Sequence, residues 1–142
     1  MKLDDVEQRH KFVDDLIKKA FELEESFIHD EEFGDDWGGA MSTVENLIAL
    51  AEMIRTEQIF QSTLAEMKSV RSRNPDEKET YLSIVDDALA FFIDTLLLSR
   101  IEFAIDQLSD WDFKSERGKK FQKTFCKKLD TLIKKYQDIY DL

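Results

Sequence analysis

Apolar and polar residues recur with the period of an α-helix along four long segments of the chain. In residues 3–29, ten apolar side chains fall on one half of a helical wheel drawn at about 100° per residue. They are Val6, Phe12, Val13, Leu16, Ile17, Ala20, Phe21, Leu23, Phe27 and Ile28. Charged side chains such as Lys18 and Glu22 fall on the opposite half. This segment is therefore predicted to form an amphipathic helix, which ends at the glycine-rich stretch that follows.

The second predicted helix spans about 42–71. Ser42 and Glu45 have the spacing of a capping box, in which each side chain satisfies a free backbone amide at the start of a helix. The apolar stripe of this helix moves from the side of Leu47 to the side of Phe60 partway along. Such a shift predicts either a bend in the helix or contacts with different neighbours along its length.

A third helix is predicted to start at Asn74 and Pro75, because asparagine is a favourable N-cap and proline suits the first helical position. The helix is expected to run to about Leu108. On a straight wheel its apolar residues cover most of the circumference. A helix of that kind is expected at the centre of a fold or at a subunit interface.

The fourth predicted helix spans about 115–140 and has the narrowest apolar stripe, opposite a row of lysines. The chain shows no strand pattern and no tandem repeat. Four long helices joined by short loops predict an all-α fold. The favoured architecture is an antiparallel up-down-up-down four-helix bundle, formed by residues 1–142 as a single domain, with the third helix central or at a dimer interface.

In this topology the first and third loops lie at the same end of the bundle, and both are rich in aromatic and acidic residues. The predicted partner-binding residues are Asp30, Glu31, Glu32, Phe33, Asp35, Asp36, Trp37, Asp110, Trp111 and Asp112. Exposed rings supply apolar contact area, and the surrounding carboxylates attract a basic partner. The alternative is that Trp37 and Trp111 fold back and close the end of the core, with the acids in solvent around them.

The net charge of −11 narrows the class of partner. Residues 113–135 hold nine basic and two acidic residues, or +7, so the rest of the chain carries −18. An acidic surface repels the phosphates of nucleic acids, so we expect a protein partner, basic in character, and no direct nucleic-acid binding. The only cysteine is Cys126, which fits a reducing cytoplasm. No apolar run is long enough to span a membrane, so a cytoplasmic protein without membrane contact is expected.

Charged residues also fall on the apolar arcs of the predicted helices. Glu24 lies inside the arc of the first helix, and Asp94 and Arg100 lie among apolar residues of the third. Because charges are rarely buried without a partner, we predict a buried polar network of Glu24, Arg55, Asp94 and Arg100 that fixes helix register. An acid-lined pocket, or a polar seam in a dimer interface, is the functional alternative.

Acidic residues on the first helix suggest a second functional class. Glu22 and Glu25 begin a polar stripe that is interpreted either as a solvated face or as a divalent-ion site. The pair is similar to the first Glu-x-x-Glu pair of helical nucleotide pyrophosphohydrolases of the MazG type, which hold magnesium with the help of a later Glu-x-x-Asp pair. Glu102 and Asp106 are one residue too far apart for that second pair. The resemblance implies a magnesium-dependent nucleotide pyrophosphohydrolase of all-α type as an alternative function.

Other catalytic signals are sparse. Both histidines are predicted near solvent and the chain has no glycine-rich phosphate loop, so no catalytic residue, metal ligand or cofactor is assigned. We therefore expect a small acidic protein that binds and regulates or inhibits another protein, as immunity proteins, antitoxins and anti-defence proteins do. A structural homodimer built on the exposed side of the third helix is the remaining alternative.

Overall fold

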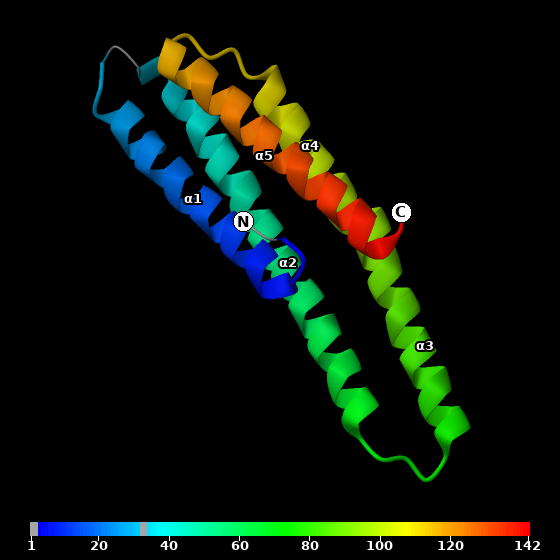
Figure 1. The fold of residues 1–142 in the computed structure, drawn as a ribbon. Helices are drawn as coiled ribbons and strands as arrows, with labels where there is room; N and C mark the ends of the chain where they lie inside the picture. Colours follow the sequence, from blue (N-terminus) through cyan, green and yellow to red (C-terminus); the bar gives the residue numbers. More distant parts are fainter. Residues whose placement is uncertain (1–2, 32–33) are drawn as a thin grey trace.

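The computed structural model describes residues 3–31 and 34–142, and over these residues it contains helices, turns and loops but no strand (Figure 1). Its elements are α1 (Val6–Ile28), η1 (Gly34–Asp36), α2 (Trp37–Ser69), α3 (Pro75–Phe91), η2 (Phe92–Leu97), α4 (Leu98–Asp110) and α5 (Glu116–Tyr140). Here η1 is a single 3₁₀ turn and η2 is a π-helix. Because α3, η2 and α4 follow one another without a break, they form one rod. The prediction of an all-α protein with four helices is confirmed.

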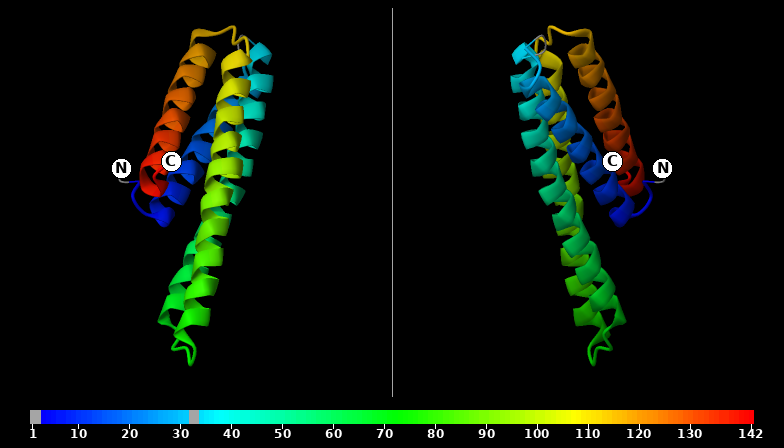
Figure 2. Two further views of the ribbon diagram at one scale, coloured as in Figure 1. Left: turned by 90° about the vertical axis from the view of Figure 1, so that its right-hand side faces the viewer. Right: turned by 90° about the vertical axis from the view of Figure 1, so that its left-hand side faces the viewer.

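The four rods are arranged in two layers. α1 and α5 lie on one side of the pair formed by α2 and the α3–α4 rod (Figure 2). Successive rods are joined by short loops and reverse direction at each one (Figure 1). The lower part of α2 and most of α3 continue beyond the ends of α1 and α5 (Figure 1). We call this two-helix extension, residues 62–88, the arm.

The core lies among the four rods where all of them are present. Each rod contributes fully buried side chains, such as Phe27 of α1, Ile54 of α2, Ile101 of α4 and Leu129 of α5. The Phe27 ring meets the Phe121 ring of α5 edge-on, with centroids 6.4 Å apart, so aromatic packing joins α1 to α5. None of the helices within the described ranges is long and apolar enough to cross a membrane.

Side chains that cap helices fix two of the predicted starts. The Asn74 side chain accepts a hydrogen bond from the amide of Glu77 at the start of α3, and the Ser115 hydroxyl accepts one from the amide of Gly118 at the start of α5. The predicted capping box at Ser42 is wrong, because α2 already begins at Trp37. Two glycines make this extra turn unfavourable by local propensity, so tertiary contacts described below must hold it.

The π-helix η2 explains why the third helix looked apolar on nearly all sides. A π-turn closes over one more residue than an α-turn, so it rotates all that follows by about 100° relative to a straight helix. With this rotation, the buried residues Leu89, Ile93, Leu97, Ile101 and Ala104 form one stripe along the rod. A single helical wheel for the whole segment ignores this rotation, so it shows the buried residues on nearly all sides of the helix.

Candidate functional site

Asp36 joins the two loops that meet at one end of the molecule, at the top of Figure 1. Its side chain is fully buried and accepts hydrogen bonds from the backbone amides of Lys114 (2.7 Å) and Ser115 (3.0 Å) and from the Ser115 hydroxyl. Gly118 leaves room for it, since a Cβ at that position would lie 2.4 Å from Asp36 Oδ2. A carboxylate beside the free amides at the start of α5 is electrostatically favourable. The prediction that Asp36 faces a partner is therefore wrong, because its oxygens are occupied within the fold.

The glycine pair at the start of α2 makes space for the Trp111 indole. A Cβ on Gly39 would lie 2.5 Å from Trp111 Cδ1 and 2.7 Å from the ring of Phe113, and a Cβ on Gly38 would lie 3.0 Å from Trp111 Cζ2. The indole therefore rests directly on the α2 backbone, and this contact explains why α2 extends through two glycines. Trp111 remains 39% exposed, so one edge of the ring reaches solvent.

Trp37 occupies the same end and is half-buried. Its indole Nε1 donates a hydrogen bond to Glu24 Oε1 at 3.2 Å. With Ile28 and Gly34 it lines an open cavity of about 310 Å³. The structure thus places both tryptophans at one end of the molecule and seals neither of them from solvent.

The acidic residues surround these rings unevenly. Glu31, Asp35, Asp110 and Asp112 are exposed, and Asp30 is half-buried. Asp112 forms an ion pair with Lys114, whose hydrogen bond and charge lower the pKa of the Asp112 carboxyl. Glu32 and Phe33, which are also predicted to bind a partner, lie outside the described residues. The exposed acids and the Trp111 edge together form what we call the acidic-aromatic end: Glu31, Asp35, Asp110, Trp111 and Asp112.

The predicted buried network of Glu24, Arg55, Asp94 and Arg100 is not formed. Arg55 is exposed and pairs with Glu52 of its own helix, and Asp94 is exposed within η2. Arg100 is half-buried, donates to Asn46 Oδ1 at 3.1 Å and stacks over a phenylalanine ring. A straight helical wheel places Asp94 and Arg100 among apolar residues, but the π-turn shifts every later residue by about 100°. Arg100 therefore leaves the buried stripe, and Leu98 and Ile101 no longer flank Asp94.

A different polar network is buried where α1, α2 and α5 meet. The Arg9 guanidinium and the Glu57 carboxylate, 1% and 0% exposed, form two hydrogen bonds of 3.2 and 2.8 Å. The hydroxyls of Tyr136 and Tyr140 donate to the two Glu57 oxygens at 2.9 and 2.5 Å. A further Arg9 nitrogen donates to the Leu3 carbonyl at 3.1 Å. Every atom of the ion pair that needs a partner has one, so the network joins three helices at the level where the arm begins.

The sequence does carry a signal for this network. Arg9 precedes Val13 and Leu16 at helical spacing, and Glu57 follows Ile54 on the buried stripe of α2. Each charge therefore interrupts an apolar stripe. Their mutual contact, across 48 positions of the chain, is a tertiary property that spacing alone does not give.

Tyrosine ionisation should make the protein unstable at high pH. Burial and the nearby Glu57 charge raise the pKa of both Tyr136 and Tyr140 in the folded state. Above about pH 10 only the unfolded chain loses these protons, so the free energy of unfolding should fall by about 1.4 kcal/mol per pH unit for each tyrosine. Urea denaturation between pH 9 and about pH 11.5 measures this slope. The double variant Tyr136→Phe/Tyr140→Phe should give a flatter curve, whereas a slope as steep as that of the unchanged protein would contradict the assignment.

The acidic residues considered for metal binding lie apart. Glu22 and Glu25 are exposed on α1, and Glu102 and Asp106 are exposed on α4. Across residues 3–31 and 34–142, no group of three His, Cys, Asp or Glu side chains is placed to hold a metal ion.

The structure therefore has an exposed acidic-aromatic end, whose two loops are joined by the hydrogen bonds of the buried Asp36. The buried polar network of Arg9 and Glu57 lies away from this end. Comparisons of the chain with protein-family models, with curated proteins and with solved structures found no match.

Proposed function

We propose that this protein is a non-enzymatic binding protein, which regulates or inhibits a basic protein partner through its acidic-aromatic end. The mode of action is that of immunity proteins, antitoxins and anti-defence proteins, in which a small folded domain covers a functional surface of its target. The proposal takes the antiparallel up-down-up-down bundle as its frame. That frame is supported by the reversal of direction at each loop, which brings the first and third loops together (Figure 1).

The exposed part of Trp111 among exposed carboxylates is the observation that carries the proposal. Tryptophan is among the residues that contribute most to protein–protein binding, because it buries a large rigid surface. The ring is held against Gly38 and Gly39, so little conformational entropy is lost when a partner covers it. Asp110 precedes Trp111 in the chain, and Asp35 lies three positions before Gly38, which the indole contacts. Both acids are exposed and give this end the charge that speeds association with a basic surface.

Reversing the charge of the acidic-aromatic end should abolish capture of the partner. We expect the variant Asp35→Lys/Asp110→Lys to retain less than about one tenth of the partner that the unchanged protein captures, since like charges across an interface cost several kcal/mol. The measurement is affinity capture from a lysate of the producing cells, followed by quantitative mass spectrometry. Asp36 is left unchanged because its carboxylate holds the two loops together.

The matched control is Glu79→Lys/Asp86→Lys, which changes the net charge by the same amount at two exposed positions of α3. This control should capture the same partner undiminished, and the affinity of the purified pair should fall as salt is raised. Equal loss in both variants would show that overall charge, and not the acidic-aromatic end, governs binding. Undiminished capture by Asp35→Lys/Asp110→Lys would overturn the proposed surface.

A further inference from the structure

Exposed apolar side chains are concentrated in the segment from Ile59 to Phe103, on α2 and the α3–α4 rod. Thirteen large hydrophobic residues are exposed in the described part of the chain, and seven of them belong to this set. They are Ile59, Val70, Tyr81, Ile84, Phe91, Leu96 and Phe103, with exposed fractions from 45% to 62%. We call these seven residues the apolar face. An exposed apolar surface of this extent is characteristic of an interaction site.

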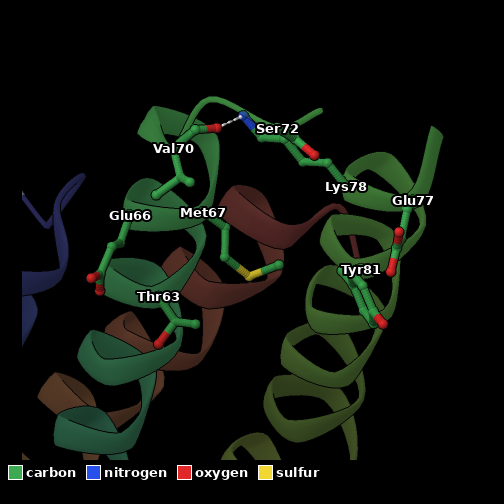
Figure 3. A pocket seen from close by; sticks show the side chains of 8 residues that line it. All are labelled: Thr63, Glu66, Met67, Val70, Ser72, Glu77, Lys78 and Tyr81. Atoms are coloured by element: carbon green, nitrogen blue, oxygen red, sulfur yellow. Dashed lines mark hydrogen bonds between the residues drawn. The ribbon is translucent and has the colours of Figure 1, made fainter. Parts of the chain in front are cut away.

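A cavity at the tip of the arm brings together two residues of the apolar face, Val70 at the end of α2 and Tyr81 of α3. The cavity has a volume of about 460 Å³ and is lined by Thr63, Glu66, Met67, Val70, Ser72, Glu77, Lys78 and Tyr81 (Figure 3). Lys78 closes the tip, since its ammonium donates to the backbone carbonyls of Lys68 and Val70 at the end of α2. The two walls of the cavity are therefore held together, with Met67 and Tyr81 on opposite sides of it (Figure 3).

The apolar face continues from the α2 and α3 walls of the cavity along both helices, as their helical spacing indicates. Ile59 lies one turn before Thr63 on α2, and Ile84 lies one turn after Tyr81 on α3. The rings of Phe60 and Phe92 are 5.9 Å apart, which places their neighbours Ile59 and Phe91 at the same level. Ile59 also follows Glu57 by two positions, or about 200°, so it points away from α1 and α5, to which Glu57 is bonded.

The π-helix keeps the apolar face continuous on the α3–α4 rod. Tyr81, Ile84 and Phe91 follow one another at i, i+3 and i+10. Leu96 and Phe103 would leave this stripe on a straight helix. The π-helix η2 contains one extra residue, so Leu96 and Phe103 occupy the orientations that positions i+14 and i+21 would have on a straight helix. These positions complete a heptad pattern that begins at Tyr81.

We propose that a second copy of this chain covers the apolar face, in an antiparallel arrangement centred on Phe91. The spacing of the face supports this arrangement. Tyr81 lies about 15 Å from Phe91 along the rod, and Phe103 lies about 15–18 Å from it in the other direction. A two-fold axis at Phe91 therefore sets Phe103 of the second copy over the cavity at Tyr81, and the reverse contact forms at the same time, as in an isologous interface.

Charge supports the same arrangement. The Arg100 guanidinium stacks over the Phe103 ring, 4.8 Å from its centroid. When Phe103 of the second copy covers the cavity, Arg100 of the second copy approaches with it. The residues that line the cavity there include Glu66 and Glu77, and the ammonium of the remaining charged residue, Lys78, is bonded to backbone carbonyls. A cation thus approaches a lining with two acidic residues in each half of the interface.

The size of the face suits a stable dimer. From Tyr81 to Phe103 it extends about 33 Å, and the two-helix surface that carries it is about 20 Å wide, so this surface, polar residues of α2 included, has a projected area of roughly 650 Å² per copy. A specific interface buries about 800 Å² of accessible surface on each partner, and a ridged surface has more accessible than projected area. A second copy is also present wherever the chain is made. This inference is independent of the proposed function, because it uses a different surface.

The unchanged protein should sediment with twice its chain mass of 16.7 kDa at tens of micromolar concentration. The variant Phe91→Glu places two like charges at the two-fold axis and should sediment as a monomer. Phe21→Glu is the matched control, because this ring is 47% exposed on α1, outside the apolar face, and should leave the dimer intact. Circular dichroism checks folding, and Ile84→Glu replaces Phe91→Glu if that variant is unfolded.

Disulfide trapping tests the antiparallel arrangement. In a Cys126→Ser background, a mixture of Tyr81→Cys and Phe103→Cys chains should form an intermolecular disulfide under mild oxidation, whereas Tyr81→Cys chains alone should not. A monomer at 100 µM would exclude the second copy as the occupant. A dimer that survives both Phe91→Glu and Ile84→Glu would exclude the apolar face, and trapping of Tyr81→Cys with itself would exclude the antiparallel arrangement.

Discussion

Replacing Arg9 with methionine should lower the free energy of unfolding by about 3–5 kcal/mol, because it leaves the Glu57 carboxylate buried without its cation. Arg9 and Glu57 are almost completely buried, so water cannot take the place of the lost partner. Methionine keeps much of the length and apolar volume of the arginine stem, so it leaves little empty space. The decrease in the free energy of unfolding therefore reflects mainly the loss of the charge and its hydrogen bonds. Urea denaturation at pH 7, followed by far-UV circular dichroism, measures the change.

Arg55→Met is the matched control for this effect. Arg55 makes an exposed ion pair with Glu52 at 3.7 Å, and such pairs contribute about 0–1 kcal/mol. The double variant Arg9→Met/Glu57→Leu should regain about 2 kcal/mol relative to Arg9→Met, since it removes the unpaired charge, although two tyrosine hydroxyls then lose their acceptor. If Arg9→Met and Arg55→Met differ by less than about 1 kcal/mol, the buried network does not stabilise the fold as described.

Replacing Asp36 with alanine should cost about 3 kcal/mol, the second largest effect that we expect. The change removes three hydrogen bonds to a fully buried carboxylate at the start of α5 and leaves the part-buried amides of Lys114 and Ser115 without that acceptor. It also removes a negative charge from the N-terminal end of a helix. Thermal and urea denaturation should both show the loss.

The neighbouring acid provides the control for this second effect. Asp35 is exposed, and Asp35→Ala should change the free energy of unfolding by no more than about 0.5 kcal/mol. In the Asp36→Ala variant, Trp111 should also become more accessible, because the α4–α5 loop loses its attachment to the first loop. Its fluorescence emission should shift to longer wavelength. An unshifted spectrum with unchanged stability would remove Asp36 from its structural role.

Local signals in the sequence were sufficient to place two helix starts. Asn74 and Ser115 cap helices through bonds to amides three residues away, so the interaction is complete within a short segment. The start of α2 could not be read in this way. Its first turn contains two glycines and depends on Trp111, which lies more than seventy positions further along the chain. Ser42 offered a plausible cap, but tertiary packing had already extended the helix past it.

The candidate site was predictable only as a group of residues. Helix count and loop order bring Trp37 and Trp111 to one end, and that placement needs no side-chain detail. Which of the two consecutive acids turns inward depends on the 3₁₀ turn η1, and here Asp36 is buried while Asp35 is exposed. A run of like charges carries no pattern that distinguishes its members.

The extra residue in the π-helix η2 affects how the protein can accommodate insertions and deletions. Along one helix, an inserted or deleted residue normally displaces every later side chain from its neighbours. Here the segment 92–97 takes up that displacement, so the side chains of α3 are aligned with α2, and those of α4 are aligned separately with α2 and α5. A residue inserted or deleted in α3 therefore need not displace the contacts of α4 with α2 and α5, provided that the segment 92–97 readjusts.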